Sequence, residues 1–350
     1  MPPVALTAVA PRPVRKLLPS SDVAIITLIT LGFVAVGLLI SEITGIPFTV
    51  PQPGKIPGLD ANYWTPPIIA IASYLVLQLA ARALSAEKRS WRDLARHGAQ
   101  DYFLLGLFIL VIYVHFNIKM WVPVINPRLY DQDYFAIDQA LRPIIDLFVF
   151  LRQGVARVLP AADIWYQAAF FAIFVLSFLA HSMGRRRWHY HNMVGLLLIE
   201  IVGPLTYLIA PAVGPFIYEQ GPNALATKAE LAMYDVYRQV QEGGAAWIAQ
   251  HGGQYFAEPL AAMPSLHVGA SFVIVYYAFR ARLWVAPLIA LTFFWIFIES
   301  VVARWHYLID LPVGLLLAAA VIAVTNHLCR GRFVPDMPRK DAEGAYARNA

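Results

Sequence analysis

Three residues in the last third of the sequence have the types and spacing of a phosphoryl-transfer site. His267 lies in the apolar segment MPSLHVGASF, and His306 and Asp310 lie in ARWHYLIDLPVG. A neutral imidazole can attack phosphorus when a carboxylate orients its far nitrogen, and a second imidazole can protonate the departing oxygen. On a helix, His306 and Asp310 would share one face because they are four residues apart. The competing interpretation of His267 alone is a packed histidine at the head of a hydrophobic helix.

The chain that must position these residues has the composition of a polytopic membrane protein. Of its 350 residues, 59% are hydrophobic and 14% are charged, whereas soluble domains carry about a quarter charged residues. Each long apolar run approaches the ~20 residues that a helix needs to cross a bilayer. We therefore predict an all-α membrane protein with eight transmembrane helices, at residues 22–42, 65–84, 101–118, 162–183, 192–212, 264–281, 283–303 and 307–328.

The basic residues predict the orientation of these helices. With the N-terminus in the cytoplasm, the inner segments hold 18 of the 27 Lys and Arg residues, as the positive-inside rule requires. Both termini are then cytoplasmic, and His267 and His306 both lie at outer ends of helices, in one membrane plane. Because most basic residues follow topology, a nucleic-acid binder is excluded.

Two long outer loops separate the predicted helices. Residues 119–161 have an apolar spacing that suggests a helix in or dipping into the interface. Residues 213–263 contain ATKAELAMYDVYRQVQ, a candidate amphipathic helix. Loops of this length are often lids or binding loops, and a surface cap without a chemical role is the alternative. Glu200 lies too deep within its predicted helix for direct chemistry, and we expect a structural hydrogen bond there.

Two motifs resemble a known family. PSLH at 264–267 and HYLID at 306–310 are similar to the second and third signature motifs of the phosphatidic acid phosphatase type 2 superfamily. Their wording is most similar to its inositol-phosphorylceramide-synthase-like branch. The resemblance covers roughly residues 100–328. It implies that His306 is the nucleophile of a phosphohistidine intermediate, that Asp310 orients it, and that His267 is the general acid/base.

The resemblance also implies a domain organisation. A six-helix catalytic membrane domain would span 100–328, preceded by two further helices and an inner loop at 22–99. Cytoplasmic tails would occupy 1–21 and 329–350. No cofactor and no metal site is expected, since the His and Asp residues lack the spacing of a zinc site.

The chain departs from the superfamily pattern at its cations. The first motif pairs a Lys with an Arg-Pro seven residues later, but Phe135 stands at the Lys position before Arg142-Pro143. Ser300 stands where an Arg usually precedes the third motif. We expect the substrate phosphate to be bound by four basic residues of the same outer face, namely Lys119, Arg128, Arg142 and Arg304. The helix N-terminus at Ser265 is expected to bind it as well.

Because Phe135 and Ser300 replace two cations of the superfamily pattern, the sequence favours a singly charged phosphodiester over a doubly charged phosphate monoester as substrate. The leading hypothesis is a transferase that moves a phospho-headgroup, such as phosphoinositol, from a phospholipid to a lipid alcohol. The alternative is a lipid phosphate phosphatase in which water is the acceptor. A transporter is the alternative of another class, although the charged residues gather at one face rather than along a midplane path. The expected partners are membrane lipids, and the expected location is a bacterial inner membrane with the site on the extracytoplasmic face.

Overall fold

The computed structural model describes residues 21–52, 64–84, 91–159, 161–184, 186–256 and 258–330. Within these ranges the chain forms eleven α-helices and two short 3₁₀ helices, with no strand, which confirms the predicted all-α class. The tails at 1–20 and 331–350 lie outside the described residues.

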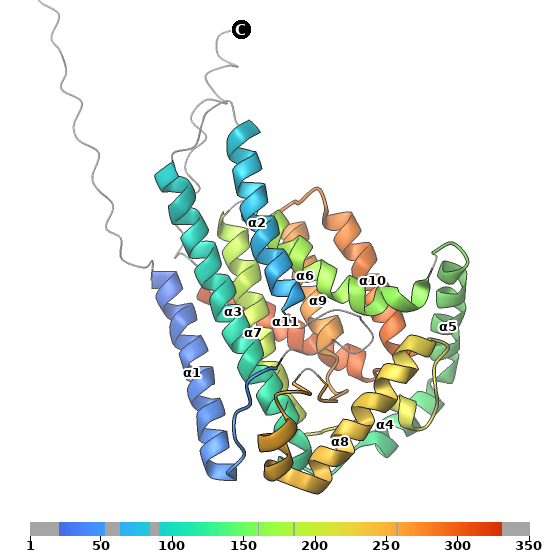
Figure 1. Cartoon of the computed structure of the whole chain (residues 1–350). Helices are drawn as coiled ribbons and strands as arrows, with labels where there is room; N and C mark the ends of the chain where they lie inside the picture. The colour runs from blue at the N-terminus through green and yellow to red at the C-terminus, as the bar shows by residue number, and fades with distance from the viewer. Residues whose placement is uncertain are drawn as a thin grey trace, which may run out of the picture.

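All eight predicted membrane segments are helical, and Figure 1 shows their arrangement. Five helices are long and apolar enough to cross a membrane, namely those at Val23–Thr44, Thr65–Leu84, His97–Ile125, Ala162–Met183 and Asp310–Leu328. The protein is therefore an integral membrane protein. The bounds of the eight helices are α1 (Ser21–Thr44), α2 (Thr65–Leu84), α3 (Trp91–Ile125), α6 (Trp165–Met183), α7 (Arg186–Tyr207), α9 (Leu266–Arg280), α10 (Ala286–Val302) and α11 (Asp310–Leu328).

Two boundaries differ from the predictions in ways that matter for the site. Helix α3 continues to Ile125, so Lys119 belongs to its last turns rather than to an outer loop. Helix α11 begins only at Asp310, so His306 lies in the connection from α10 and not on a helix with Asp310. The helical i,i+4 argument for this pair was therefore wrong in its local geometry, although the two side chains do meet.

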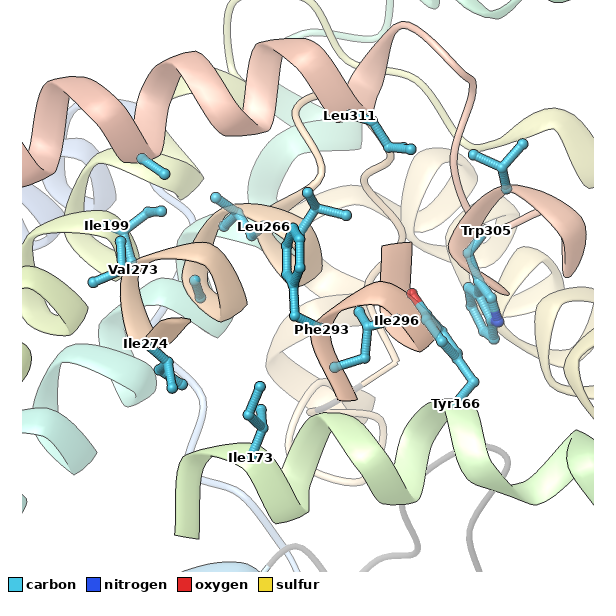
Figure 2. Close-up of a cluster of buried hydrophobic side chains, with 14 of the residues drawn as sticks. Tyr166, Ile173, Ile199, Leu266, Val273, Ile274, Phe293, Ile296, Trp305 and Leu311 are labelled. Atoms are coloured by element: carbon cyan, nitrogen blue, oxygen red, sulfur yellow. The ribbon is translucent and has the colours of Figure 1, made fainter. Parts of the chain in front are cut away.

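Helix α9, which carries His267, lies at the centre of the bundle and contacts α6, α7, α10 and α11. Its buried Leu266, Val273 and Ile274 join Phe293 of α10 and Ile199 of α7 in one apolar cluster (Figure 2). Burial of such surface stabilises contacts between helices where water is displaced, and close packing fixes the helices relative to each other. The first turn of α9 is thus held in place on several sides.

The two long loops form helices of their own, as predicted. Residues 119–161 contribute α4 (Asp131–Ala140) and α5 (Arg142–Ala156), and the second loop contributes α8 (Ala224–His251), which is kinked at Gly244. The 3₁₀ helices are η1 (Ala162–Ile164) and η2 (Pro215–Ile217). In Figure 1, α4 and α8 lie together at the lower end of the bundle.

A buried polar cluster attaches these loop helices to the bundle. Arg152 of α5 contacts Glu299 of α10 at 3.3 Å and also pairs with Asp163. The Asn223 side chain accepts a hydrogen bond from Ala226 N–H as the N-cap of α8, and its amide donates to Glu299 Oε1 at 2.8 Å. Because buried ionic groups need such partners, the cluster fixes where α5 and α8 begin or end.

Candidate active site

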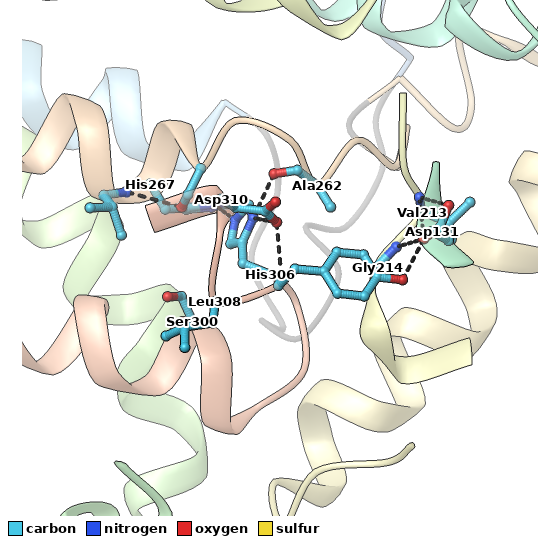
Figure 3. Close-up of polar contacts among 12 residues, drawn as sticks. Asp131, Val213, Gly214, Ala262, His267, Ser300, His306, Leu308 and Asp310 are labelled. Atoms are coloured by element: carbon cyan, nitrogen blue, oxygen red, sulfur yellow. Dashed lines mark hydrogen bonds and ion pairs between the residues drawn. The ribbon is translucent and has the colours of Figure 1, made fainter. Parts of the chain in front are cut away.

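The two predicted histidines face each other across the start of α9 and the α10–α11 connection. His306 Nδ1 lies 2.8 Å from Ala262 O and 3.3 Å from Asp310 Oδ2 (Figure 3). Both of these atoms are acceptors, so Nδ1 carries the proton and Nε2 of a neutral ring keeps its lone pair. That Nε2 lies 3.3 Å from Nδ1 of His267. The atom suited to attack phosphorus therefore points at the second imidazole.

Asp310 has contacts beyond His306. Its Oδ2 accepts a hydrogen bond from Tyr307 N–H at 2.8 Å, and its carbonyl accepts from Ser265 N–H at 3.1 Å. An added Cβ on Gly314 would lie 2.4 Å from Ser265 O, so glycine permits α11 to approach the start of α9 this closely. These contacts fix the two histidine-bearing segments against each other.

Ser265 caps α9. Its hydroxyl oxygen accepts a hydrogen bond from Val268 N–H at 3.4 Å, and the residue is fully buried. The structure thus gives Ser265 a structural role at the helix N-terminus.

Two aspartates of α4 brace the segment that carries His306. Asp131 accepts hydrogen bonds from Val213 N–H, Gly214 N–H and the Tyr307 hydroxyl at 2.7–3.0 Å (Figure 3). Asp138 lies two helical turns later on the same face and accepts from Leu308 N–H at 2.8 Å. Burial raises the pKa of Asp138 to about 6. Tyr307 and Leu308, which lie between His306 and Asp310, are therefore tied to a helix far away in sequence.

Aromatic side chains pack against His267. The ring centroids of Phe170 and Tyr166 lie 4.2 Å and 5.5 Å from that of His267, and Trp305 stacks on Tyr166 at 6.5 Å. Such walls limit the access of water to the histidine pair, in which the ring of His306 is the neutral one. Chemistry at this point would proceed in a desolvated site.

Two of the predicted phosphate-binding arginines lie in one ionic cluster. Glu219 accepts hydrogen bonds from Arg142 Nη1 and Nη2 at 2.6 and 2.9 Å, and it also pairs with Arg304. Arg304 Nη1 lies 3.7 Å from Asp138 Oδ2. The arginine hydrogen bonds hold the pKa of Glu219 below its usual range, so this carboxylate stays ionised at neutral pH. Two carboxylates thus offset the charge of two arginines.

The remaining predicted cations are placed differently from each other. Arg128 is exposed and stacks 4.6 Å over the ring of Tyr130, away from any contact with the histidine pair. Lys119 lies 5.6 Å over the ring of Tyr207, close enough to His267 for their charges to interact. Glu200, predicted as structural, contacts His115 Nδ1 at 3.1 Å. The phosphate-binding role of all four cations stays a prediction.

Comparison with known families decides the classification. The family model described as the PAP2 superfamily matches residues 135–324, which is more than half of the chain. The chain belongs to the PAP2 superfamily. No curated protein and no solved structure matches it.

The PAP2 match includes both histidine motifs and supports a lipid phosphatase or phosphotransferase type of enzyme. It begins at Phe135, so α3, with Lys119, lies outside it. The superfamily predicted from the two motifs is confirmed, whereas the inositol-phosphorylceramide-synthase-like branch and the division into domains stay predictions.

Sequence reasoning missed several buried acidic residues around the histidine pair and the arginine cluster. Asp131 and Asp138 were not singled out, although acids seven residues apart in an otherwise mixed apolar helix are a readable signal. Glu219 had no signal, because its partners are 77 and 85 residues away in sequence. Buried Glu230 of α8 also escaped notice.

Proposed function

We propose that this PAP2 protein is a lipid phosphoester transferase that moves a phospho-headgroup, of the phosphoinositol type, from a phospholipid to a lipid alcohol. The observation that carries the proposal is the tautomer imposed on His306. With Nδ1–H held by Ala262 O and Asp310, the lone pair of Nε2 is directed toward His267. This is the arrangement that a nucleophile and its acid/base partner require.

The reaction then has two balanced steps. His306 Nε2 attacks the phosphorus while the bond from phosphorus to the diacylglycerol oxygen breaks. His267, which enters this step as an imidazolium, gives that oxygen a proton and becomes neutral. Asp310 stabilises the positive charge that forms on the phosphorylated ring, through Nδ1–H. In the second step the acceptor hydroxyl attacks the phosphorus while His267 takes its proton, and the P–N bond breaks to restore His306.

The charges near the site favour a diester substrate. Phe135, at the usual Lys position, stacks on Tyr218 with ring centroids 4.5 Å apart. Ser300 is fully buried, and its hydroxyl donates a hydrogen bond to Phe297 O at 2.9 Å. Arg142 and Arg304 are already offset by Glu219 and Asp138. A site with so little net positive charge stabilises a monoanion better than a dianion. The enclosed aromatic walls likewise favour a lipid alcohol over water as acceptor.

The location of the site is part of the proposal. We take the histidine pair to lie on the extracytoplasmic face of a bacterial inner membrane, and the distribution of basic residues supports this side and cytoplasmic termini. A reporter fused after Arg282 should behave as cytoplasmic, and one inserted near Gly243 as extracytoplasmic. The same side for both fusions would contradict the orientation.

The deciding experiment follows the products of purified protein given phosphatidylinositol, with and without ceramide. A transferase releases diacylglycerol only when the ceramide is present and forms a ceramide phosphodiester, with little inorganic phosphate. If the protein instead releases inorganic phosphate rapidly from phosphatidic acid or an isoprenyl phosphate without an acceptor, the phosphatase alternative is correct.

A further inference from the structure

Glu230 of α8 is a buried acid without a hydrogen-bond partner in the described part of the chain. Its side chain is 0% exposed, and neither carboxyl oxygen has a hydrogen-bond partner within the described ranges of the chain. Nearly all buried polar groups in native proteins are hydrogen-bonded, so an unpartnered carboxyl group marks a place where a ligand or ordered water completes the site.

Other buried polar atoms of the described residues also lack hydrogen bonds, although Arg304 Nη1 keeps its ionic contact with Asp138. The Tyr166 hydroxyl, Trp305 Nε1 and Arg304 Nη1 are buried and likewise have no hydrogen-bond partner among the residues that the structure describes. Glu230 is close enough to Arg304 and to Tyr166 for their charges to interact. Tyr166 and Trp305 lie side by side in Figure 2, and Tyr166 also contacts His267. The unpartnered atoms thus gather next to the histidine pair.

The chemistry of these atoms selects the class of ligand. Burial raises the pKa of Glu230 to about 9, so at neutral pH its carboxyl group is protonated and both donates and accepts hydrogen bonds. The Tyr166 hydroxyl does the same, whereas Arg304 and Trp305 only donate. A phosphate offers acceptors alone, a hydrocarbon offers neither, and an ammonium headgroup would favour an ionised acid. Alcohol hydroxyls satisfy the whole set.

We propose that Glu230 and Tyr166 form a subsite that binds the hydroxyl groups of a polyol headgroup on the donor phosphodiester. Beside them, Arg304 Nη1 is placed for the phosphate oxygens of the same donor. The inference rests on the proposed function, because it takes the donor to be a phosphodiester at His306. It adds which feature of that donor is recognised and by which residues.

The test compares two donors that carry one negative charge each. Phosphatidylinositol has a polyol headgroup and phosphatidylethanol has none, and both release diacylglycerol. In mixed micelles with ceramide, the wild type should show a higher kcat/KM for phosphatidylinositol. Glu230→Met, which removes the hydrogen bonds and keeps the side-chain volume, should lower the ratio of the two kcat/KM values about tenfold, the size expected for lost buried hydrogen bonds.

Matched variants separate recognition from folding. Glu230→Gln keeps a donor and an acceptor and should retain most of the ratio, and Tyr166→Phe keeps the ring contacts and should lower it several-fold. Glu242→Gln is the control, because Glu242 is exposed on the same helix and pairs with Arg238. If Glu230→Met does not fold, the ratio in Tyr166→Phe decides.

Three outcomes overturn the subsite: a wild type that does not distinguish the donors, folded variants with an unchanged ratio, or variants that change only the KM for ceramide. A change in only the KM for ceramide would show that these polar atoms bind the acceptor and not the donor. Failure of the transferase proposal is visible separately, since diacylglycerol would then be released without ceramide while the donor ratio is still measurable.

Discussion

Arg304 and His306 are two residues apart in sequence, yet their surroundings differ in charge. Around His306, the partners are neutral or shared: a backbone carbonyl, a second imidazole and one carboxylate, enclosed by aromatic rings. Around Arg304, the partners are Glu219 and Asp138, with Arg142 joined through Glu219. The first region leaves the lone pair of His306 Nε2 available. In the second, carboxylates offset the positive charge that would otherwise attract a phosphate.

This difference separates reactivity from binding strength. In a desolvated site, a neutral nucleophile avoids the cost of a buried charge, and its activity depends on orientation. In the ionic cluster, each carboxylate competes with the substrate for the arginines, so affinity for highly charged phosphates is reduced. Substitutions in the first region should therefore change the rate, and those in the second should change substrate preference.

The largest expected effect is at the nucleophile. His306→Ala should reduce phosphodiester turnover to the detection limit and remove any acid-labile phosphoenzyme, because no other ring is oriented by Ala262 O and Asp310. Rapid quench with labelled donor measures both. His251→Ala, which changes an exposed histidine of α8, should retain turnover and the phosphoenzyme. Near-normal turnover in His306→Ala would falsify the mechanism.

A smaller loss is expected at the partner ring. His267→Ala should slow turnover by ~10²-fold or more, since general acid catalysis contributes at least that much. The acid becomes unnecessary when the leaving group is already stable. A p-nitrophenyl phosphodiester should therefore be cleaved by His267→Ala with a much smaller loss than phosphatidylinositol. An equal loss for both substrates would assign His267 to positioning alone.

The sequence predicts the first region well and the second poorly, for a physical reason. His306, Asp310 and the PSLH segment form contacts within short stretches or at helix starts, where residue type and membrane topology limit the possible geometry. Glu219 and the α4 aspartates reach their partners only through tertiary packing of loops that have no membrane to fix their depth. Lys119 was expected in a loop but lies in the last turns of α3, because the end of this helix is set by packing rather than by hydropathy.

Asp138 joins the two regions and should act on stability. Its folded pKa of about 6 lies above the unfolded value, so the folded protein holds this proton more tightly. The contribution of Asp138 to the free energy of unfolding therefore falls as pH rises from about 4 to about 6. Asp138→Asn keeps an acceptor for Leu308 N–H and removes the charge.

Melting in detergent at pH 4.5 and 7.5 tests this effect of Asp138. The Tm of Asp138→Asn minus that of wild type should be higher at pH 7.5 by at least ~2 °C. Asp133→Asn, an exposed change on the same helix, should show the same difference at both pH values. An Asp138→Asn difference that does not depend on pH would show that the carboxylate carries no burial cost.

The smallest expected effect tests whether Glu219 lowers the preference for doubly charged phosphates. Glu219→Gln removes one negative charge between Arg142 and Arg304 and leaves an amide that still accepts a hydrogen bond. The freed positive charge attracts a dianion more strongly than a monoanion, so kcat/KM for phosphatidic acid relative to phosphatidylinositol should rise ~3-fold. The Glu219 side chain is 33% exposed, so salt can screen the charges around it. In about 0.5 M salt, where screening limits charge interactions to a few ångströms, the rise in the kcat/KM ratio should therefore be smaller. Glu242→Gln, which removes the same charge outside the cluster, should leave the ratio unchanged. If Glu219→Gln lowers turnover of both substrates equally, the carboxylate is needed to hold the arginines in place, and the contrast between the two regions concerns structure rather than substrate charge.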